Sequence, residues 1–201
     1  MKLLIATRNP GKVSEIRALL GAGLRRNVEI LTLYDMRNVL EPRESGKTFS
    51  ENARVKALHY AKECRMLCIA DDSGLAVDAL GGRPGVRSAR FAGDQATDEQ
   101  NIALLLEELH PRPLPWTAAF LCVAVAALPG RVVAEATGRV DGEILSTPRG
   151  TGGFGYDPVF RVKGSPKTMA ELPPEEKNRI SHRGQAIRLL VGQLRNSGVF
   201  G

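Results

Sequence analysis

Short apolar runs alternate with longer mixed stretches from the first residues of the chain onward. Residues 2–6 predict a buried strand, and a polar turn at 7–11 leads into a helix over about 12–20. Residues 28–33 predict a second strand and residues 66–70 a third. This order of strands and helices predicts an α/β domain.

Two capping boxes predict where further helices begin. Thr48 and Glu51 form the first, and its helix is expected to run to about Glu63. Thr97 and Gln100 form the second, whose helix stops before the proline at 111. The side chains of such a pair satisfy backbone N–H groups that the first helical turn leaves without partners.

The second half of the chain predicts a long β-hairpin. The apolar run at 118–128 is followed by Pro129-Gly130 and by a second stretch at 131–140. The run has about half the length of a membrane-spanning helix, and the turn after it fits a sheet. The other predicted elements are a loop at 81–93, a glycine-rich loop at 150–156, a strand at 159–162 and a helix over about 181–195. We expect one domain over residues 1–201, with the hairpin forming a second lobe.

Composition narrows the class of protein. With 201 residues, of which 43% are hydrophobic, the chain can bury a core, which excludes a disordered or fibrous protein. The net charge of +6 favours an anionic partner, which can be nucleic acid, a membrane surface or a phosphorylated small molecule, or it only aids solubility. Cys64, Cys68 and Cys122 form no C-x-x-C pair, which suits a reducing compartment. Since no signal peptide or membrane span is evident, we expect a soluble cytoplasmic protein.

A pair of neighbouring aspartates is the clearest indication of a functional site in the sequence. Asp71 and Asp72 end the apolar run at 66–70 and are followed by Ser73-Gly74. Neighbouring carboxylates at the end of a buried strand repel each other and lose hydration, so they usually need a cation between or beside them. Other acids that offer oxygen ligands are Glu44, Glu51 and Asp78. Mg²⁺ usually takes only one or two carboxylates besides water and phosphate, so most of these acids are expected to be structural.

Several short motifs fail on their context. Residues 9–12 resemble the end of a Walker A loop, but Ala6 and Val13 stand where that loop needs glycine and a hydroxyl residue. The G-x-G-x-x-G match at 150–155 is followed by a strand rather than a helix, which excludes a dinucleotide fold. There is no G-x-S-x-G or H-E-x-x-H motif. Residues 7–12 still join a strand to a helix N-terminus, which is either an anion site or an ordinary polar turn.

Cations and aromatic residues near the C-terminal end suggest a second binding group. Lys177, His182 and Arg183 lie around the start of the final predicted helix, where the helix dipole disfavours positive charge unless an anion is present. His182 taken alone is more often a structural hydrogen-bonding residue. Phe154 and Tyr156, flanked by glycines, either anchor the loop or stack on a base, and the glycines favour stacking.

Five ordered motifs resemble one known family. They are A-T-R-N-P-G-K at 6–12, S-G-K-T-F-S-E-N-A at 45–53, A-D-D-S-G-L-A-V-D-A-L-G-G-R-P-G-V-R-S-A-R at 70–90, G-T-G-G-F-G-Y-D-P at 150–158, and E-E-K at 175–177 with S-H-R-G-Q-A at 181–186. Together they resemble the inosine and xanthosine triphosphate pyrophosphatases. The resemblance implies Mg²⁺-dependent hydrolysis of ITP, dITP and XTP to the monophosphate and pyrophosphate, which cleanses the nucleotide pool. It also implies an elongated α/β fold with two lobes around a long mixed sheet, a nucleotide in the cleft, and a homodimer.

The same resemblance implies roles for individual residues. By position, Asp72 is the general base and a metal ligand, Glu44 is a second metal ligand, and Asp71 supports the metal. The residues implied on the phosphate side are Thr7, Arg8, Asn9, Pro10, Gly11, Lys12 and Ser73. Those implied on the base and sugar side are Phe154, Gly155, Tyr156, Asp157, Lys177, His182 and Arg183. Donors aimed at the 6-oxo group would favour hypoxanthine and xanthine over adenine, and Arg183 and backbone N–H groups near Phe154 are the candidates.

Two other functions compete with this one. A related septum-inhibitor-like pyrophosphatase would act on other modified nucleotides, but the S-H-R-G-Q-A segment argues against it. A basic nucleic-acid-binding protein would need a Lys/Arg stripe with interleaved aromatic residues. Aromatic residues make up only 5% of this chain, and the cations lie beside glycine loops. We therefore expect purine nucleoside triphosphates as partners, and neither nucleic acid nor a membrane.

Overall fold

The structure, a computed structural model, describes residues 1–24 and 28–199, which form six strands and five α-helices. The strands are β1 (Lys2–Ile5), β2 (Glu29–Thr32), β3 (Leu67–Val77), β4 (Trp116–Leu128), β5 (Arg131–Ile144) and β6 (Phe160–Val162). The α-helices are α1 (Pro10–Gly23), α2 (Phe49–Cys64), α3 (Asp98–Leu109), α4 (Pro174–Ile180) and α5 (His182–Asn196). Short 3₁₀ helices are η1 (Leu33–Asp35), η2 (Asp78–Leu80), η3 (Gly85–Arg90), η4 (Asp157–Val159) and η5 (Met169–Glu171).

The six strands form one mixed sheet in the order β2-β1-β3-β4-β5-β6. Strand β1 pairs in parallel with β2 and with β3, whereas β5 and β6 are antiparallel. Strands β4 and β5 match the predicted hairpin. The prediction of an α/β fold around a mixed sheet is therefore confirmed.

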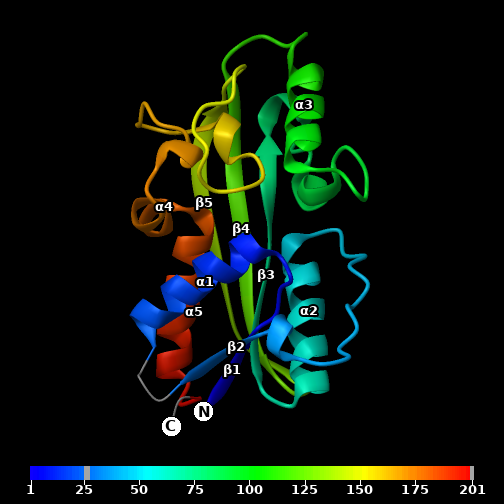
Figure 1. The fold of residues 1–201 in the computed structure, drawn as a ribbon, viewed down its shortest axis with the longest axis vertical. Coiled ribbons are helices and arrows are strands. Elements are labelled where there is room, and N and C mark those ends of the chain that lie inside the picture. Colours follow the sequence, from blue (N-terminus) through cyan, green and yellow to red (C-terminus); the bar gives the residue numbers. More distant parts are fainter. Residues whose placement is uncertain (25–27, 200–201) are drawn as a thin grey trace. The chain divides into compact units, whose positions relative to one another are not determined.

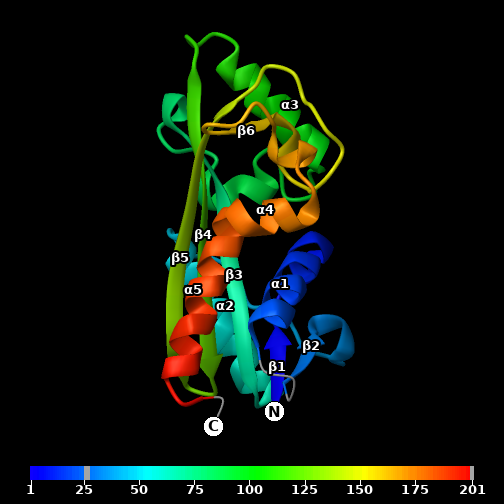
Figure 2. The same ribbon diagram turned by 90° about the vertical axis from the view of Figure 1, so that its left-hand side faces the viewer.

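The chain divides into two compact units, and unit 1 contains Met1–Asp72, Cys122–Gly138 and Arg183–Gly201. In this unit helices cover both faces of the strands (Figure 1). Helices α1 and α5 pack on one face, which Figure 2 shows from their own side, and α2 packs on the other. Each face therefore has its own apolar core.

Residues of β3 within unit 1 alternate between these two cores. Leu67 and Ile69 belong to the core under α1 and α5, whereas Cys68 and Ala70 belong to the core under α2. Successive side chains of a strand point to opposite faces of the sheet. The strand continues past Ala70, so the prediction that it ends before the paired aspartates is wrong.

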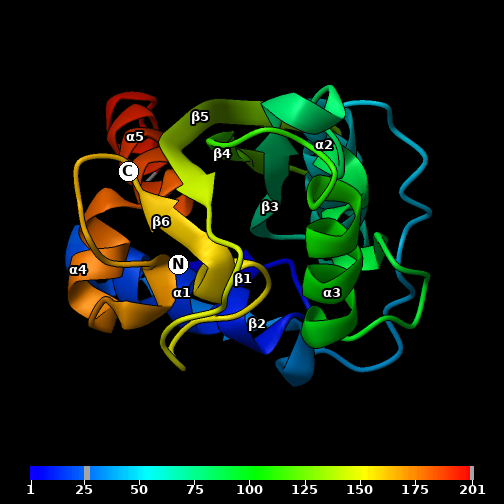
Figure 3. The ribbon, with the colours of Figure 1, turned by 90° about the horizontal axis from the view of Figure 1, so that it is seen from above.

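Unit 2 contains Ser73–Leu121 and Arg139–His182. Its core gathers apolar side chains of α3, of η5 and of the parts of β3 to β6 that lie in this unit. Helices α3 and α4 lie on opposite sides of the unit (Figure 1 and Figure 3). Within the predicted loop at 81–93 the chain forms η3, and neither η3 nor α4 was expected from the sequence.

Other local predictions have definite outcomes. Both capping boxes are present, at the first turns of α2 and α3. All three cysteines are free, with Cys68 and Cys122 buried and Cys64 half-buried. Among the described residues, no helix combines the length and the apolar character that a membrane crossing requires.

Candidate functional site

The N-terminus of α1 provides a possible anion site. The Asn9 side chain caps the helix, because its Oδ1 accepts the N–H of Lys12 at 3.0 Å, and Pro10 occupies the first turn. Thr7 Oγ1 in turn accepts the N–H of Asn9 at 3.2 Å. Helix N-termini favour negative charge through their dipole and their exposed N–H groups. Since the Lys12 ammonium lies 3.0 Å from Asp71, this end of the helix lies beside the paired aspartates.

Asp71 faces α1 and α5 and is neutralised there. Its Oδ2 lies 3.0 Å from Lys12 Nζ and 3.2 Å from Arg183 Nε, and Arg183 also lies 2.5 Å from Glu15. Burial alone would raise the pKa of Asp71, but the neighbouring cations outweigh it and hold this pKa well below its usual value. Asp71 is therefore an ionised group that holds two cations in position.

Asp72 faces α2 and has different partners. Asn52 Nδ2 donates to its Oδ2 at 3.1 Å, and Lys56 Nζ lies 3.1 Å from its Oδ1. The same ammonium lies 2.8 Å from Glu44. Burial raises the pKa of the Asp72 carboxyl above its ordinary value, although Lys56 and Lys12 act in the opposite direction. A more basic carboxylate is the better proton acceptor, which suits a general base.

Seven charged residues of unit 1 form what we call the charged cluster. Its members are Lys12, Glu15, Glu44, Lys56, Asp71, Asp72 and Arg183. In these pairs each of the three cations lies beside at least one of the four carboxylates.

Two carboxylates of the charged cluster fit a divalent cation. The Lys56 ammonium already lies between Glu44 and Asp72, so this position accepts positive charge. One or two carboxylates, completed by water and phosphate, are the usual ligands of Mg²⁺. Among the described residues no group of three or more His, Cys, Asp or Glu side chains that could hold a metal ion occurs. Asp71 lies on the other face of β3, and its role at the metal stays a prediction.

Arg8 is oriented toward a neighbouring segment. Its guanidinium lies 2.8 Å from Glu41 and donates to the carbonyl oxygen of Val39 at 3.0 Å. Tyr34 Oη donates to the Arg8 carbonyl oxygen at 2.7 Å. The side chain therefore holds the segment that leads to Glu44.

The glycine loop of unit 2, residues 150–155, is held by carboxylates. Asp157 accepts the N–H of Phe154 at 2.9 Å and forms a buried ion pair with Lys177, whose ammonium lies 4.9 Å from the centre of the Phe154 ring. The N–H of Gly155 donates to Asp98 at 2.6 Å. The structure thus brings three of the residues predicted for the base side together. A 6-oxo group would have to compete with Asp157 for the Phe154 N–H.

Tyr156 and His182 are fixed by neighbours in unit 2. The Tyr156 hydroxyl donates to the carbonyl oxygen of Ser88 at 2.9 Å, so this buried side chain anchors the loop. Burial raises the pKa of the Tyr156 phenol. The His182 ring stacks on Phe120, with ring centres 4.8 Å apart. These contacts favour anchoring for both side chains, while their roles in substrate binding stay predictions.

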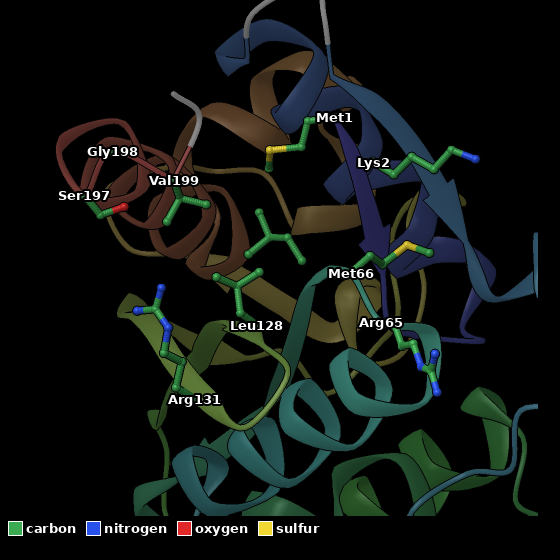
Figure 4. Close-up of a pocket in the computed structure, with 10 residues that line it drawn as sticks. Met1, Lys2, Arg65, Met66, Leu128, Arg131, Ser197, Gly198 and Val199 are labelled. Atoms are coloured by element: carbon green, nitrogen blue, oxygen red, sulfur yellow. The ribbon is translucent and has the colours of Figure 1, made fainter.

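Each unit also has a hollow. One of about 540 Å³ lies between α3 and the glycine loop in unit 2, and only Phe154 and Gly155 of the predicted base-side residues line it. The other, of about 490 Å³, lies in unit 1 beside β1 and the turn between β4 and β5 (Figure 4). Lys2, Arg65 and Arg131 border it, but Figure 4 shows these side chains spread apart. They do not converge on one anion, and we assign no role to this hollow.

Comparison with known proteins identifies the family. The model of the Ham1 family matches residues 3–193. The chain belongs to the Ham1 family. A dITP/XTP pyrophosphatase of Geobacillus kaustophilus is 50% identical over 193 residues, which cover 96% of this chain and 93% of that protein. Another from Geobacter sulfurreducens is 49% identical over 199 residues, or 98% of each chain. The solved structure of a HAM1 protein from Coxiella burnetii has a TM-score of 0.87 at 38% identity, covering 98% of this chain and 99% of that one.

This Ham1 family match confirms the resemblance that the motifs indicated. The structure also gives partners in the charged cluster to three residues to which sequence reasoning assigned no role, namely Glu15, Asn52 and Lys56. Asn52 and Lys56 are four residues apart on α2, on the side of buried Ala53 and Ala57, and polar residues there are a signal in the sequence. Glu15 follows Lys12 by one helical turn, which is too common a spacing to indicate a site.

Proposed function

We propose that this Ham1 chain hydrolyses ITP, dITP and XTP to the nucleoside monophosphate and pyrophosphate, with Mg²⁺ as cofactor. One observation carries the proposal, which is the Asp72 carboxylate held between Asn52 and Lys56 with Glu44 close by. The names of the Geobacillus and Geobacter relatives, both dITP/XTP pyrophosphatases, support the same activity.

The phosphate side of the reaction uses the charged cluster. A triphosphate brings about four negative charges, and its hydrolysis depends mainly on positioning and charge neutralisation. The N-terminus of α1 and Lys12 would bind these phosphates, while Arg183 stays with Asp71 and balances its charge. Asp71 would thereby position the Lys12 ammonium for the phosphates of the substrate.

The chemical step is a water attack at the α-phosphorus. The new P–O bond forms as the bond to pyrophosphate breaks, and Asp72 takes the proton of the attacking water. Glu44 and Asp72 would hold Mg²⁺, which would neutralise phosphate charge and make the water more acidic. The raised pKa of Asp72 suits this proton transfer.

The base side uses the residues around the glycine loop. Phe154 offers a ring and Lys177 a cation fixed by Asp157. Leaving the 2-amino group of guanine without a partner would disfavour GTP by roughly 1–3 kcal/mol. The homodimer that the resemblance implies stays a prediction, as does the cytoplasmic location expected from the cysteines and the missing signal peptide.

A panel of nucleotides tests this function. The purified chain is incubated with ITP, dITP, XTP, GTP, ATP and modified pyrimidine triphosphates, with Mg²⁺ or with a chelator, and pyrophosphate release is followed. We expect turnover of the three deaminated purines, little of ATP and GTP, and none with the chelator.

Each contrary outcome points to a different conclusion. Equal turnover of GTP and ITP would contradict the proposed specificity. Faster turnover of modified pyrimidine nucleotides would favour the septum-inhibitor-like alternative. No turnover, combined with tight RNA binding in a parallel titration, would favour the nucleic-acid-binding alternative.

A further inference from the structure

Asn52 joins two parts of the charged cluster through one buried amide. Only 1% of this residue is exposed. Its Nδ2 donates to Asp72 Oδ2 at 3.1 Å, and its Oδ1 accepts the N–H of Gly46 at 2.8 Å. Gly46 follows Glu44 by two residues. The amide therefore contacts both the carboxylate on β3 and the segment that carries Glu44.

The two bonds fix which way the amide points. A backbone N–H can only donate, so Gly46 must meet the amide oxygen. The amide nitrogen is then directed at Asp72, whose ionised carboxylate can only accept. Neither an ionised aspartate nor an alanine at this position could make both bonds.

The segment of Gly46 passes directly against this amide. A Cβ added at Gly46 would lie 2.5 Å from Asn52 Oδ1 and 2.8 Å from Glu51 Cβ. Only a residue without a side chain allows this approach. The close contact thus depends on both Gly46 and Asn52.

We propose that Asn52 is a positioning residue, whose amide orients Asp72 and holds the Glu44 segment so that both carboxylates face one cation. The proposal rests on the proposed function. With Oδ2 bound to Asn52, Oδ1 is the oxygen of Asp72 that faces Lys56, and Lys56 in turn contacts Glu44. Residues that orient metal ligands typically change metal affinity or activity roughly 10–100-fold when they are replaced.

Two substitutions separate the two bonds. Asn52→Asp keeps an oxygen for Gly46 but removes the donor to Asp72, so kcat for ITP should fall about 10–100-fold while KM changes little. The Gly46 N–H should keep its protection from hydrogen exchange, measured by NMR without substrate or metal. Asn52→Ala removes both bonds, so this N–H should exchange faster, and the Mg²⁺ concentration for half-maximal rate should rise.

Asn101 on α3 provides the matched control. It is 2% exposed, its Oδ1 accepts the N–H of Ala92 at 2.8 Å, and its Nδ2 donates to the carbonyl oxygen of Ala89 at 3.3 Å. Asn101→Asp changes the same atoms in a similar bridge outside the charged cluster. Its melting temperature should fall as that of Asn52→Asp does, while its kcat stays within about threefold of wild type.

The outcomes separate the two proposals. Equal losses of kcat in Asn52→Asp and Asn101→Asp would overturn the positioning role, as would unchanged Gly46 protection in Asn52→Ala. A wild-type chain that releases no pyrophosphate would overturn the proposed function, whereas the Gly46 exchange measurement tests the amide bridge without any turnover.

Discussion

The two units hold polar groups in different ways. In unit 1 the charged cluster combines four carboxylates and three cations from several elements, and Asp71, Asp72 and Arg183 are its buried members. In unit 2 the glycine loop relies on one buried ion pair, between Asp157 and Lys177, and on backbone N–H groups bound to Asp98 and Asp157. The charged cluster depends on the balance between its carboxylates and cations. The glycine loop depends on the backbone conformation that presents its N–H groups to the two aspartates.

This difference predicts which substitutions should affect catalysis and which should affect the stability of the fold. The ion pairs of the charged cluster share members, so a cation or phosphate that binds there can replace one partner, and substitutions should act mainly on catalysis. The Asp157–Lys177 pair is buried and also fixes a loop, so its loss should act mainly on folding. Four predictions test this contrast.

The largest effect is expected at Asp72. Asp72→Asn keeps the size of the side chain but removes the proton acceptor, so kcat for ITP should fall about 10²–10⁴-fold with little change in substrate affinity. Steady-state kinetics and equilibrium nucleotide binding measure the two quantities. Asp78→Asn, an exposed aspartate bound to Thr117 in unit 2, is the control. A loss of less than about tenfold in Asp72→Asn would place the base elsewhere.

Lys177→Met should destabilise the fold by about 3–5 kcal/mol, because it leaves the Asp157 carboxylate buried without its cation. The free energy of unfolding in urea measures this loss. Adding Asp157→Asn removes the buried charge, so the double variant should regain part of the stability. A double variant less stable than Lys177→Met alone would contradict the proposed dependence on this pair.

The pKa values of the paired aspartates should be shifted in opposite directions in the metal-free chain. Burial raises the pKa of Asp72, whereas the cations around Asp71 lower its pKa despite burial. Asp72 thus favours folding less as the pH rises through its raised pKa, while Asp71 stabilises the fold above its unfolded pKa of about 3.9 and loses this contribution as the pH falls. Carboxyl ¹³C NMR should show Asp72 taking up its proton first on acidification. The reverse order would contradict this assignment.

The smallest effect is expected at Arg8, whose exposed guanidinium contacts Glu41 and Val39 rather than the charged cluster. Arg8→Ala should cost at most about 1 kcal/mol of stability, and kcat/KM should change less than about fivefold. Lys12→Ala should instead raise KM markedly, since it removes a half-buried cation from the proposed phosphate side. If Arg8→Ala raised KM as much as Lys12→Ala does, Arg8 would be a direct phosphate ligand.

Local signals predicted most of the fold. The capping boxes at Thr48 and Thr97 determined the starts of α2 and α3, because their bonds are made within one helical turn. The end of β3 was not predictable in this way. Asp, Ser and Gly disfavour strands on local propensity, but in the folded chain sheet pairing and buried partners such as Lys12 and Asn52 outweigh that preference.

The candidate site was predictable only in part. Asp72 and Lys12 stand in recognisable motifs, whereas the contact of Lys56 with Glu44 joins α2 to a segment without regular structure. The cations near the final helix have carboxylate partners that the sequence did not indicate. Lys177 lies beside Asp157 and Arg183 beside Asp71, while the roles of both cations in substrate binding stay predictions.

The alternation of β3 also makes the charged cluster sensitive to the length of this strand. Asp71 and Asp72 meet different helices only because an even or odd place in the strand decides the face. A single-residue insertion or deletion between Leu67 and Asp71 would exchange the partners of the two aspartates while leaving every functional residue in the chain. Substitutions of single residues leave this register unchanged, whereas a change of one residue in the length of the strand alters it.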